Sequence, residues 1–126
     1  MIPFRRNGDG VVFCLITAAA SRKWGIPKGM IERGTSPEET ALEEAWEEAG
    51  LRGRILGGPL GSYDYEKAGV LLTVVVYLME VEIAAGQWQE RDLRRRRWVP
   101  GGHAARMLET HPARALFEEA RKRLAG

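Results

Sequence analysis

The sequence predicts an α/β fold in which a mixed β-sheet is covered by helices on both faces. Two apolar runs, residues 11–19 and 70–79, have the composition of buried strands. A capped helix is expected over residues 37–49. A second amphipathic helix is expected over residues 112–124, where apolar residues recur at helical spacing. Strands and helices interspersed in this way favour a sheet enclosed between helices.

The composition is that of one globular domain spanning residues 1–126. Apolar residues make up 44% of the chain and charged residues 29%, which is enough for a core and excludes a disordered chain. The formal net charge of +2 is too small to imply a nucleic-acid partner. Cys14 is the single cysteine and lies in an apolar run, so we expect a small buried residue and not a nucleophile.

The sequence shows no targeting or membrane-spanning segment. The N-terminal stretch MIPFRRNGDG lacks the apolar core of a signal peptide. The longest apolar run, residues 70–79, has about half the length of a membrane span. A cytoplasmic protein without a membrane partner is therefore the expectation.

The limits of shorter elements are predicted from glycine, proline and polar residues, which favour turns and loops. Residues 24–29, with the sequence WGIPKG, are expected to form a loop or a strand edge. The run at residues 70–79 is expected to be one central strand buried on both faces. Further strands are expected at residues 30–32, 54–56, 60–65 and 95–99, and a short helix at residues 104–108.

The helix over residues 37–49 has clear start and stop signals. Ser36 is a good N-cap, Pro37 suits the first helical position, and Glu39 completes a capping box. Gly50 is placed to end the helix. Local chemistry alone therefore predicts both boundaries.

This helix carries four glutamates, Glu43, Glu44, Glu47 and Glu48, and no lysine or arginine occurs between residues 34 and 51. At about 100° per residue, the four glutamates fall within about 140° of the helix circumference. The other side of the helix is expected to dock on the sheet through its apolar residues: Ala41, Leu42, Ala45, Trp46 and Ala49.

Two explanations of the glutamates are open, a solvated acidic face and a metal site. Like charges at i,i+4 spacing destabilise a helix by about 0.2–0.5 kcal/mol per pair. The helix dipole also disfavours negative charge near the C-terminal end. A bound cation would offset both effects, and carboxylate oxygens select hard cations such as Mg²⁺ or Mn²⁺. We therefore favour the metal site.

The spacing of these residues resembles the signature of the Nudix hydrolase family, the Nudix box. That signature runs from a glycine through a first glutamate, an Arg-Glu pair and a Glu-Glu pair to a closing glycine and an aliphatic residue. The preceding segment, WGIPKG, is similar to that of members acting on dinucleoside polyphosphates or diphosphoinositol polyphosphates. The positions in register with the box are Gly29, Glu44, Glu47, Glu48, Gly50 and Leu51.

Two positions depart from the family pattern. Thr35 occupies the place of the first glutamate of the box, and Glu43 occupies the place of its arginine. In the family, that arginine pairs with the box carboxylates and helps to hold them. Arg22, Lys28 and Arg33 are the basic residues near the box that could substitute for it.

The resemblance implies a Nudix fold, an α/β/α sandwich with a mixed sheet. It also implies Mg²⁺- or Mn²⁺-dependent hydrolysis of a phosphoanhydride bond in a nucleoside-diphosphate-linked substrate, most readily a dinucleoside polyphosphate such as diadenosine tetraphosphate. The alternative is a Nudix-like ligand-binding or regulatory module with weak or no turnover, because Glu43 replaces the box arginine. Dimers are common among Nudix proteins, so a homodimer is a further expectation.

The resemblance assigns roles to individual residues. Glu44, Glu47 and Glu48 are the implied metal ligands, together with the backbone carbonyl at Gly29 or at the residue before it. The catalytic base is expected to be Glu44, Glu47 or a carboxylate from a later loop, for which Glu90 is the candidate.

Substrate contacts are expected from one lysine and three tyrosines. Lys28 is placed to meet a phosphate. Tyr63, Tyr65 and Tyr77 could stack on a nucleobase, although aromatic residues on strands also serve as packing residues. Tyr63 and Tyr65 share one strand face, which makes them the better pair.

A run of four arginines, residues 94–97, precedes Trp98. Alternate side chains of a strand point to opposite faces, so only half of these arginines could line one site. Protection of an edge strand is therefore favoured over recognition of RNA or a polyphosphate chain. His103 and His111 have no ligand-like spacing and are expected to be structural or exposed.

Overall fold

The computed structural model describes residues 1–29, 31 and 34–125. Its helices are α1 (Pro37–Ala49), α2 (Gly101–Met107) and α3 (Arg114–Ala125). Its strands are β1 (Ile2–Asn7), β2 (Gly10–Thr17), β3 (Trp24–Gly25), β4 (Leu51–Ile55), β5 (Gly61–Lys67), β6 (Val70–Val76), β7 (Leu78–Ala84) and β8 (Arg96–Pro100).

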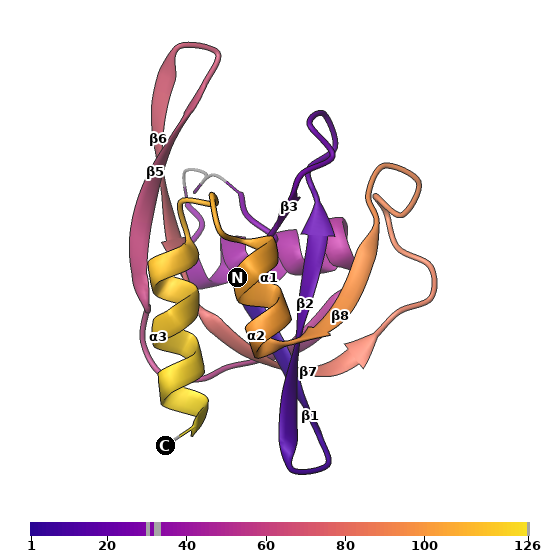
Figure 1. Ribbon diagram of the computed structural model, residues 1–126. Helices are drawn as coiled ribbons and strands as arrows, with labels where there is room; N and C mark the ends of the chain where they lie inside the picture. The colour runs from indigo at the N-terminus through magenta and orange to yellow at the C-terminus, as the bar shows by residue number, and fades with distance from the viewer. Residues whose placement is uncertain (30, 32–33, 126) are drawn as a thin grey trace.

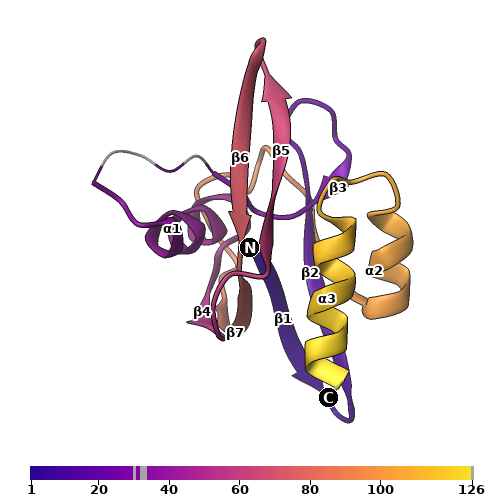
Figure 2. The same cartoon turned by 90° about the vertical axis from the view of Figure 1, so that its left-hand side faces the viewer.

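These elements form three layers. The sheet is the middle layer, and α2 and α3 lie side by side on one face (Figure 1). The view turned by 90° shows α1 on the opposite face (Figure 2). The predicted α/β/α sandwich is confirmed.

The main sheet has the strand order β3-β2-β1-β7-β4, with β8 also paired to β2. β1 runs parallel to β7, whereas the other pairs are antiparallel, so the sheet is mixed as predicted. β5 and β6 form a separate antiparallel ribbon, which projects beyond the sheet at one end (Figure 1).

β2 contributes to both halves of the core, because its side chains alternate between the two faces of the sheet. Phe13 and Leu15 lie in the apolar cluster that includes residues of α2 and α3, whereas Cys14 and Ile16 lie in the cluster that includes residues of α1. Burial raises the pKa of the Cys14 thiol to about 12, as befits a small buried residue. The predicted buried strand at residues 11–19 is thus confirmed as β2, with slightly earlier limits.

α1 has the predicted boundaries, and both of its caps are formed. The Ser36 hydroxyl accepts a hydrogen bond from the backbone N–H of Glu39 at 3.1 Å, and Pro37 opens the helix. Gly50 closes it in the left-handed conformation, with φ at 68°, where the N–H group of this residue donates to the carbonyl of Trp46.

The docked face of α1 differs in part from the expected one. Leu42 is 37% exposed and Trp46 is half-buried, so these two large residues lie at the margin of the contact with the sheet. Thr40 and Glu48 are buried instead, with Glu48 only 7% exposed. Small side chains on the buried face let the helix lie close to the sheet, and they are the three alanines of the prediction: Ala41, Ala45 and Ala49.

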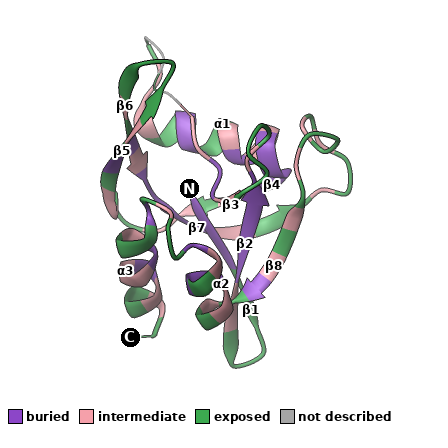
Figure 3. Cartoon of the chain, turned by 45° about the horizontal axis from the view of Figure 1, so that its top comes forward, coloured by how far each residue is buried: buried purple, intermediate pink, exposed green. Residues whose placement is uncertain are grey.

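The expectation of one central strand over residues 70–79 was wrong. Tyr77 separates β6 from β7, and the two strands belong to different sheets. The start of β6 is exposed, with Val70 56% and Leu71 70% accessible, and the ribbon tip is coloured as exposed in Figure 3. The apolar run was long because it combines the buried end of a ribbon with the start of a sheet strand.

β1 was not predicted, although it lies between β2 and β7 in the sheet. Its first half, with Ile2 and Phe4, is buried, whereas its second half is exposed and charged, so it gives only a short apolar signal. The expected strand at residues 30–32 includes Met30 and Glu32, which lie outside the described residues.

The remaining elements are present with shifted limits, as β4, β5, β8, α2 and α3. Across the described ranges, no helix is both long enough and apolar enough to cross a membrane.

Candidate active site

The four glutamates of α1 differ in burial across the helix surface. Glu48 is buried, Glu44 and Glu47 are half-buried, and Glu43 is exposed. Glu43 borders a surface hollow beside Trp46, whose ring is covered by the guanidinium of Arg52 at 3.9 Å. The helix therefore presents three carboxylates on one side and turns the fourth to solvent.

Glu48 is held by groups from two other segments. The backbone N–H of Lys28 donates to Oε1 of Glu48 at 3.0 Å, and Nη2 of Arg94 lies 3.3 Å from its Oε2. Burial raises the pKa of Glu48, and the Lys28 N–H and the Arg94 guanidinium oppose this rise by favouring the carboxylate.

Glu44 lies against Gly29 and close to the other carboxylates. A Cβ atom at Gly29 would come within 2.7 Å of Oε1 of Glu44, so only glycine allows this approach. Burial first, and then the charges of Glu48, Glu47 and Glu90, raise the pKa of Glu44 to about 7. The carboxylates that act on Glu44 come from α1 and from a later loop.

The loop between β7 and β8 is fastened to the C-terminal end of α1. The indole Nε1–H of Trp88 donates to the carbonyl of Glu48 at 3.0 Å, and the N–H of Glu90 donates to the carbonyl of Glu47 at 3.1 Å. Nη1 of Arg96, the first residue of β8, donates to the carbonyl of Ala49 at 2.8 Å. α1 has no basic residue in its last turn, so this loop and the start of β8 supply the donors that its free carbonyls require.

Arg94 joins this loop to the acidic cluster. Its Nε donates to Oε1 of Glu90 at 2.8 Å, and its Nη1 donates to the carbonyl of Thr17 at 3.2 Å. The Arg94 side chain is 15% exposed and also contacts Glu48, so one guanidinium joins two carboxylates and β2. The family motif did not point to Arg94. Except for Glu90, four residues before it, the partners of Arg94 come from distant parts of the sequence.

The alternation expected for the arginine run is present. Arg94 and Arg96 point to the end of α1, whereas Arg95 lies over the ring of Trp24 at 5.8 Å. Edge protection is therefore not the main role of Arg94 and Arg96, which bind the acidic helix. Of the basic residues expected to replace the box arginine, Arg22 is exposed in the loop after β2, and Arg33 lies outside the described residues.

A cavity of about 220 Å³ opens beside the acidic cluster. Tyr63 and Tyr65 share one face of β5, as predicted, and both line this cavity, to which Trp24 of β3 adds a third aromatic ring. Arg94 and His111 also border it. The cavity thus brings aromatic surfaces to the edge of the site. Trp24 is a lining residue that the sequence analysis did not predict, because it considered only tyrosines for stacking.

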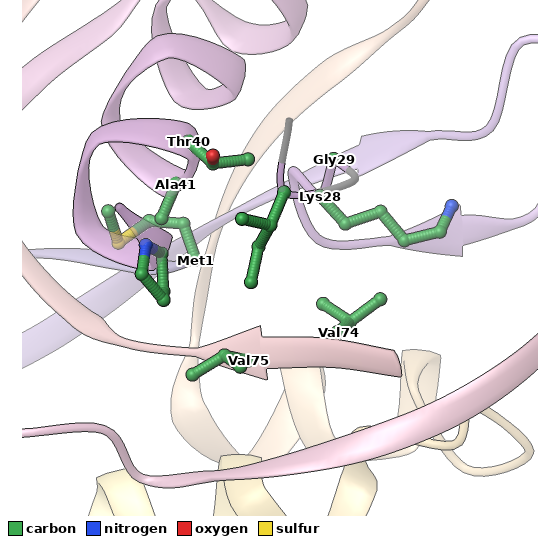
Figure 4. Close-up of a pocket in the computed structure, with 9 residues that line it drawn as sticks. Met1, Lys28, Gly29, Thr40, Ala41, Val74 and Val75 are labelled. Atoms are coloured by element: carbon green, nitrogen blue, oxygen red, sulfur yellow. The ribbon is translucent and has the colours of Figure 1, made fainter. Parts of the chain in front are cut away.

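Lys28 connects the cavity with the carboxylates. The turn at Lys28 and Gly29 closes a small cavity of about 10 Å³ against α1 and β6 (Figure 4). The Lys28 side chain extends away from Thr40 and Ala41 of α1 in that view, and its Nζ lies 4.8 Å from the centre of the Tyr65 ring. Its backbone therefore binds Glu48 while its ammonium group faces the larger cavity.

The structure defines the protonation of His111 and the hydrogen bonding of the Tyr63 hydroxyl in the larger cavity. Burial is the main reason that the pKa of His111 is lowered to about 4, and Nδ1 of this imidazole accepts a hydrogen bond from the N–H of Ala113 at 3.0 Å. The neutral ring therefore carries its proton on Nε2. The Tyr63 hydroxyl is buried and has no hydrogen-bond partner within the described part of the chain.

Tyr77 does not line this cavity. It is 3% exposed in the apolar cluster beneath α1, and its hydroxyl donates to Oε1 of Glu38 at 3.1 Å. The structure therefore corrects the expectation that Tyr77 contacts substrate: its ring packs between the sheet and α1.

The acidic cluster fits a hard divalent cation in its chemistry. Within residues 1–29, 31 and 34–125, no three carboxylate, imidazole or thiolate groups converge closely enough to hold an ion as they stand. The donors are nevertheless oxygen atoms of the kind that Mg²⁺ and Mn²⁺ prefer. Burial and then the neighbouring carboxylates raise the pKa of Glu44, and a bound cation would oppose both effects. Small side-chain rotations of Glu44 and Glu47 would be part of binding.

Comparison with known proteins connects this site to a family. The NUDIX domain model matches residues 1–120. The chain is 33% identical over 106 residues to Nudix hydrolase 4 of Arabidopsis thaliana, which covers 82% of this chain and 51% of that protein. It is 28% identical over 119 residues to diphosphoinositol polyphosphate phosphohydrolase 3-alpha of Mus musculus, covering 92% and 71%. The chain spans 38–62% of the length of three such curated relatives.

Solved structures show the same fold. The C. elegans Ap4A hydrolase superposes with a TM-score of 0.79 at 20% identity, covering 98% of this chain and 93% of that one. The NUDIX domain of Shewanella oneidensis NrtR, complexed with ADP ribose, superposes with a TM-score of 0.73 at 21% identity, covering 98% and 84%. The family model spans nearly the whole chain and agrees with the glutamates on α1, so this chain belongs to the NUDIX domain family.

Proposed function

We propose that this chain hydrolyses a phosphoanhydride bond in a nucleoside-diphosphate-linked substrate, most readily a dinucleoside polyphosphate such as diadenosine tetraphosphate. The observation that carries the proposal is the meeting of acidic cluster and aromatic cavity at Lys28 and Gly29. The backbone of Lys28 holds Glu48, Gly29 lies against Glu44, and the Lys28 side chain borders the cavity with Tyr65. A polyphosphate chain at this junction would place its nucleoside among the aromatic rings.

The cavity supplies recognition of the nucleoside. Aromatic rings such as Trp24 and Tyr65 offer flat apolar surfaces on which a base can stack. The Lys28 ammonium group offers positive charge to the phosphates. Burial lowers the pKa of Lys28 while the charge of Glu48 opposes this, so a negatively charged substrate would favour the protonated form further.

Members of this family generally use divalent cations such as Mg²⁺. Glu44, Glu47 and Glu48, with the backbone carbonyl of Gly29, are the groups proposed to hold Mg²⁺ or Mn²⁺ here. The ion would supply charge neutralisation of the phosphates and a more acidic bound water. The chain itself contributes the fixed position of Glu48 and the close approach of Glu44 to the Lys28–Gly29 turn.

A carboxylate would accept the proton of the attacking water. Glu44, Glu47 and Glu90 are the candidates. Oε1 of Glu90 is already engaged by Arg94 at 2.8 Å, which leaves Oε2 as the atom available to a water. Separate Gln substitutions at the three positions would rank them, because loss of the base lowers kcat by about 10²- to 10⁴-fold.

The named relatives support the choice of substrate class. The fold is shared with an Ap4A hydrolase and with a domain that binds ADP ribose, and the sequence is similar to a diphosphoinositol polyphosphate phosphohydrolase. All of these names refer to phosphate esters or anhydrides. We place dinucleoside polyphosphates first because the cavity is lined by aromatic rings.

The second candidate function is a ligand-binding module with weak or no turnover. It was motivated by Glu43 in place of the box arginine. The exposed position of Glu43 removes part of that argument, since its side chain is turned to solvent and borders the same surface hollow as Trp46 and Arg52. The module would bind nucleotides at the cavity, raise the melting temperature and release no product.

A panel of substrates separates the two functions. Diadenosine polyphosphates, ADP-ribose, nucleoside triphosphates and diphosphoinositol compounds would be incubated with Mg²⁺ or Mn²⁺, and products resolved by ion-exchange chromatography. We expect product only with metal and near-complete loss in Glu48→Gln. Glu43→Gln is the matched control, because it removes an exposed carboxylate from the same helix. Binding without product from any substrate, with either metal, would establish the module and reject the hydrolase.

A further inference from the structure

Arg94 occupies an unusual position between the box helix and the loop that faces it. Its guanidinium makes a contact through each of its three nitrogens, to Glu90, Glu48 and the carbonyl of Thr17. The backbone of the following residue is fixed as well, because the N–H of Arg95 donates to Oγ1 of Thr17 at 2.9 Å. A planar guanidinium suits several acceptors at fixed directions, which an ammonium group does not.

The box helix itself offers no such cation. No lysine or arginine occurs between residues 34 and 51, and position 43 holds a glutamate that faces solvent. Arg94 reaches the Glu48 carboxylate from outside the helix, out of the loop that precedes β8. The two carboxylates that it joins, Glu48 and Glu90, belong to segments 42 positions apart in the chain.

We propose that Arg94 is the positioning residue of this active site and takes over the task of the missing box arginine. It fixes the direction of the Glu48 carboxylate and draws Glu90 to the cluster. This arrangement explains how α1 tolerates a glutamate at position 43, because the organising positive charge comes from outside the helix. The inference rests on the proposed function for its kinetic readout, but its metal-binding readout does not need turnover.

The contacts also distinguish positioning from simple neutralisation of charge. Loss of a hydrogen bond that orients a metal ligand lowers metal affinity or activity by about 10- to 100-fold. Arg94→Lys keeps the charge but cannot reach three acceptors in one plane. If charge alone mattered, Arg94→Lys would behave as the wild type; if orientation matters, it loses most of the function.

The first experiment measures Mn²⁺ binding without substrate, by electron paramagnetic resonance of the free ion. We expect Arg94→Lys to weaken Mn²⁺ binding by about 10- to 100-fold. Arg97→Lys is the matched control, because Arg97 is exposed in the same run and should keep wild-type affinity. Mn²⁺ affinity of Arg94→Lys within threefold of the wild type would overturn the proposal. Thermal unfolding of each variant excludes loss of the fold as the cause.

The second experiment is a rescue. Glu43→Arg restores the arginine of the family pattern on α1. We expect it to change kcat by less than about threefold in the wild-type chain, but to recover at least about tenfold in the Arg94→Ala chain, because the two arginines serve one purpose. Equal effects in both backgrounds would show that the positions act independently, and the proposal would fail.

The kinetic constants separate positioning from substrate binding, since Arg94 also borders the cavity. A positioning residue lowers kcat with KM nearly unchanged, whereas a phosphate ligand raises KM. A rise in KM alone would overturn the proposal. If the wild type shows no turnover, the proposed function fails, and the Mn²⁺ measurement still decides the role of Arg94.

Discussion

The backbone N–H of Glu90 donates a hydrogen bond to the carbonyl of Glu47 at 3.1 Å, which joins two acidic residues through their main chains and not their side chains. The bond lies at the end of α1, where a helix has free carbonyls. The loop from β7 to β8 therefore completes the helix and brings a fourth carboxylate to the cluster. Stability of the helix end and arrangement of the site depend on the same contacts.

Trp88→Phe should weaken this connection. The substitution removes the indole donor to the Glu48 carbonyl, found at 3.0 Å, and leaves that carbonyl without its partner. We expect the free energy of unfolding to fall by about 1 kcal/mol, measured by urea titration, and kcat to fall because Glu90 is held less firmly. Gln89→Ala, an exposed neighbour, should stay within about 0.5 kcal/mol of the wild type. An unchanged midpoint in Trp88→Phe would show that the hydrogen bond adds nothing.

Gly29→Ala should disturb the approach of the turn to Glu44. The added methyl group would overlap the Glu44 side chain, with Oε1 only 2.7 Å away. We expect a loss of about 1–3 kcal/mol of stability, as for overpacked sites, and a lower affinity for Mn²⁺. Gly58→Ala is the control, because a Cβ atom there meets nothing within 4 Å. Wild-type Mn²⁺ affinity in Gly29→Ala would show that the close approach is not needed.

The acidic cluster should make stability depend on pH when no metal is bound. The pKa of Glu44 is raised from 4.5 to about 7, so the folded state binds more protons than the unfolded state between these values. Stability contributed by this group therefore falls as pH rises through the window from about 4.5 to 7. The difference between wild type and Glu44→Gln isolates this effect from other groups. Chemical unfolding in a chelating buffer should show the wild type losing stability relative to Glu44→Gln toward pH 7.

Two features of the same protein oppose or remove that trend. The pKa of His111 is lowered to about 4, so its contribution grows as pH rises from about 4 to 6.5. Mg²⁺ should restore stability near pH 7, because it binds the ionised carboxylates of the folded state. A pH-independent difference between wild type and Glu44→Gln would contradict the expected coupling among the glutamates.

The sequence predictions were accurate where an element depends on neighbouring residues and failed where it depends on residues distant in the sequence. α1 was predicted to the residue because Ser36, Pro37 and Gly50 act on their own neighbours. The run at residues 70–79 was misjudged because the boundary at Tyr77 depends on which sheet each half joins. β1 was missed because only its first three residues are apolar, whereas its polar second half is held in the sheet by pairing with β2.

The residues of the candidate site also divide into those that local sequence spacing could group and those that it could not. Glu44, Glu47 and Glu48 could be grouped from helical geometry, and Tyr63 and Tyr65 from strand alternation. Arg94 could not, because its partners Glu48 and Thr17 come from distant segments. A sequence signal did exist, since the arginine lies four residues after Glu90, but an i,i+4 pair in a loop has no meaning until the loop is folded.

Removing the hydroxyl groups of two tyrosines should change the free energy of unfolding in opposite directions. The Tyr63 hydroxyl is buried without a hydrogen-bond partner among the described residues, whereas the Tyr77 hydroxyl donates to Glu38 at 3.1 Å. Tyr63→Phe should therefore keep or raise the free energy of unfolding, by up to about 1 kcal/mol, because it removes an unsatisfied polar group. Tyr77→Phe should lower it by about 1 kcal/mol, because it removes a hydrogen bond.

The effects on KM should differ in the other direction, with a change at Tyr63 and none at Tyr77. Tyr63 lines the proposed substrate cavity and Tyr77 does not, so Tyr63→Phe should raise KM by about 2- to 10-fold if its hydroxyl finds a partner in the substrate. Tyr77→Phe should leave KM unchanged. Urea unfolding and steady-state kinetics on both variants test the assignment, and a raised KM in Tyr77→Phe with none in Tyr63→Phe would refute it. The pair thus distinguishes a tyrosine that packs the core from one whose buried hydroxyl is available to a ligand.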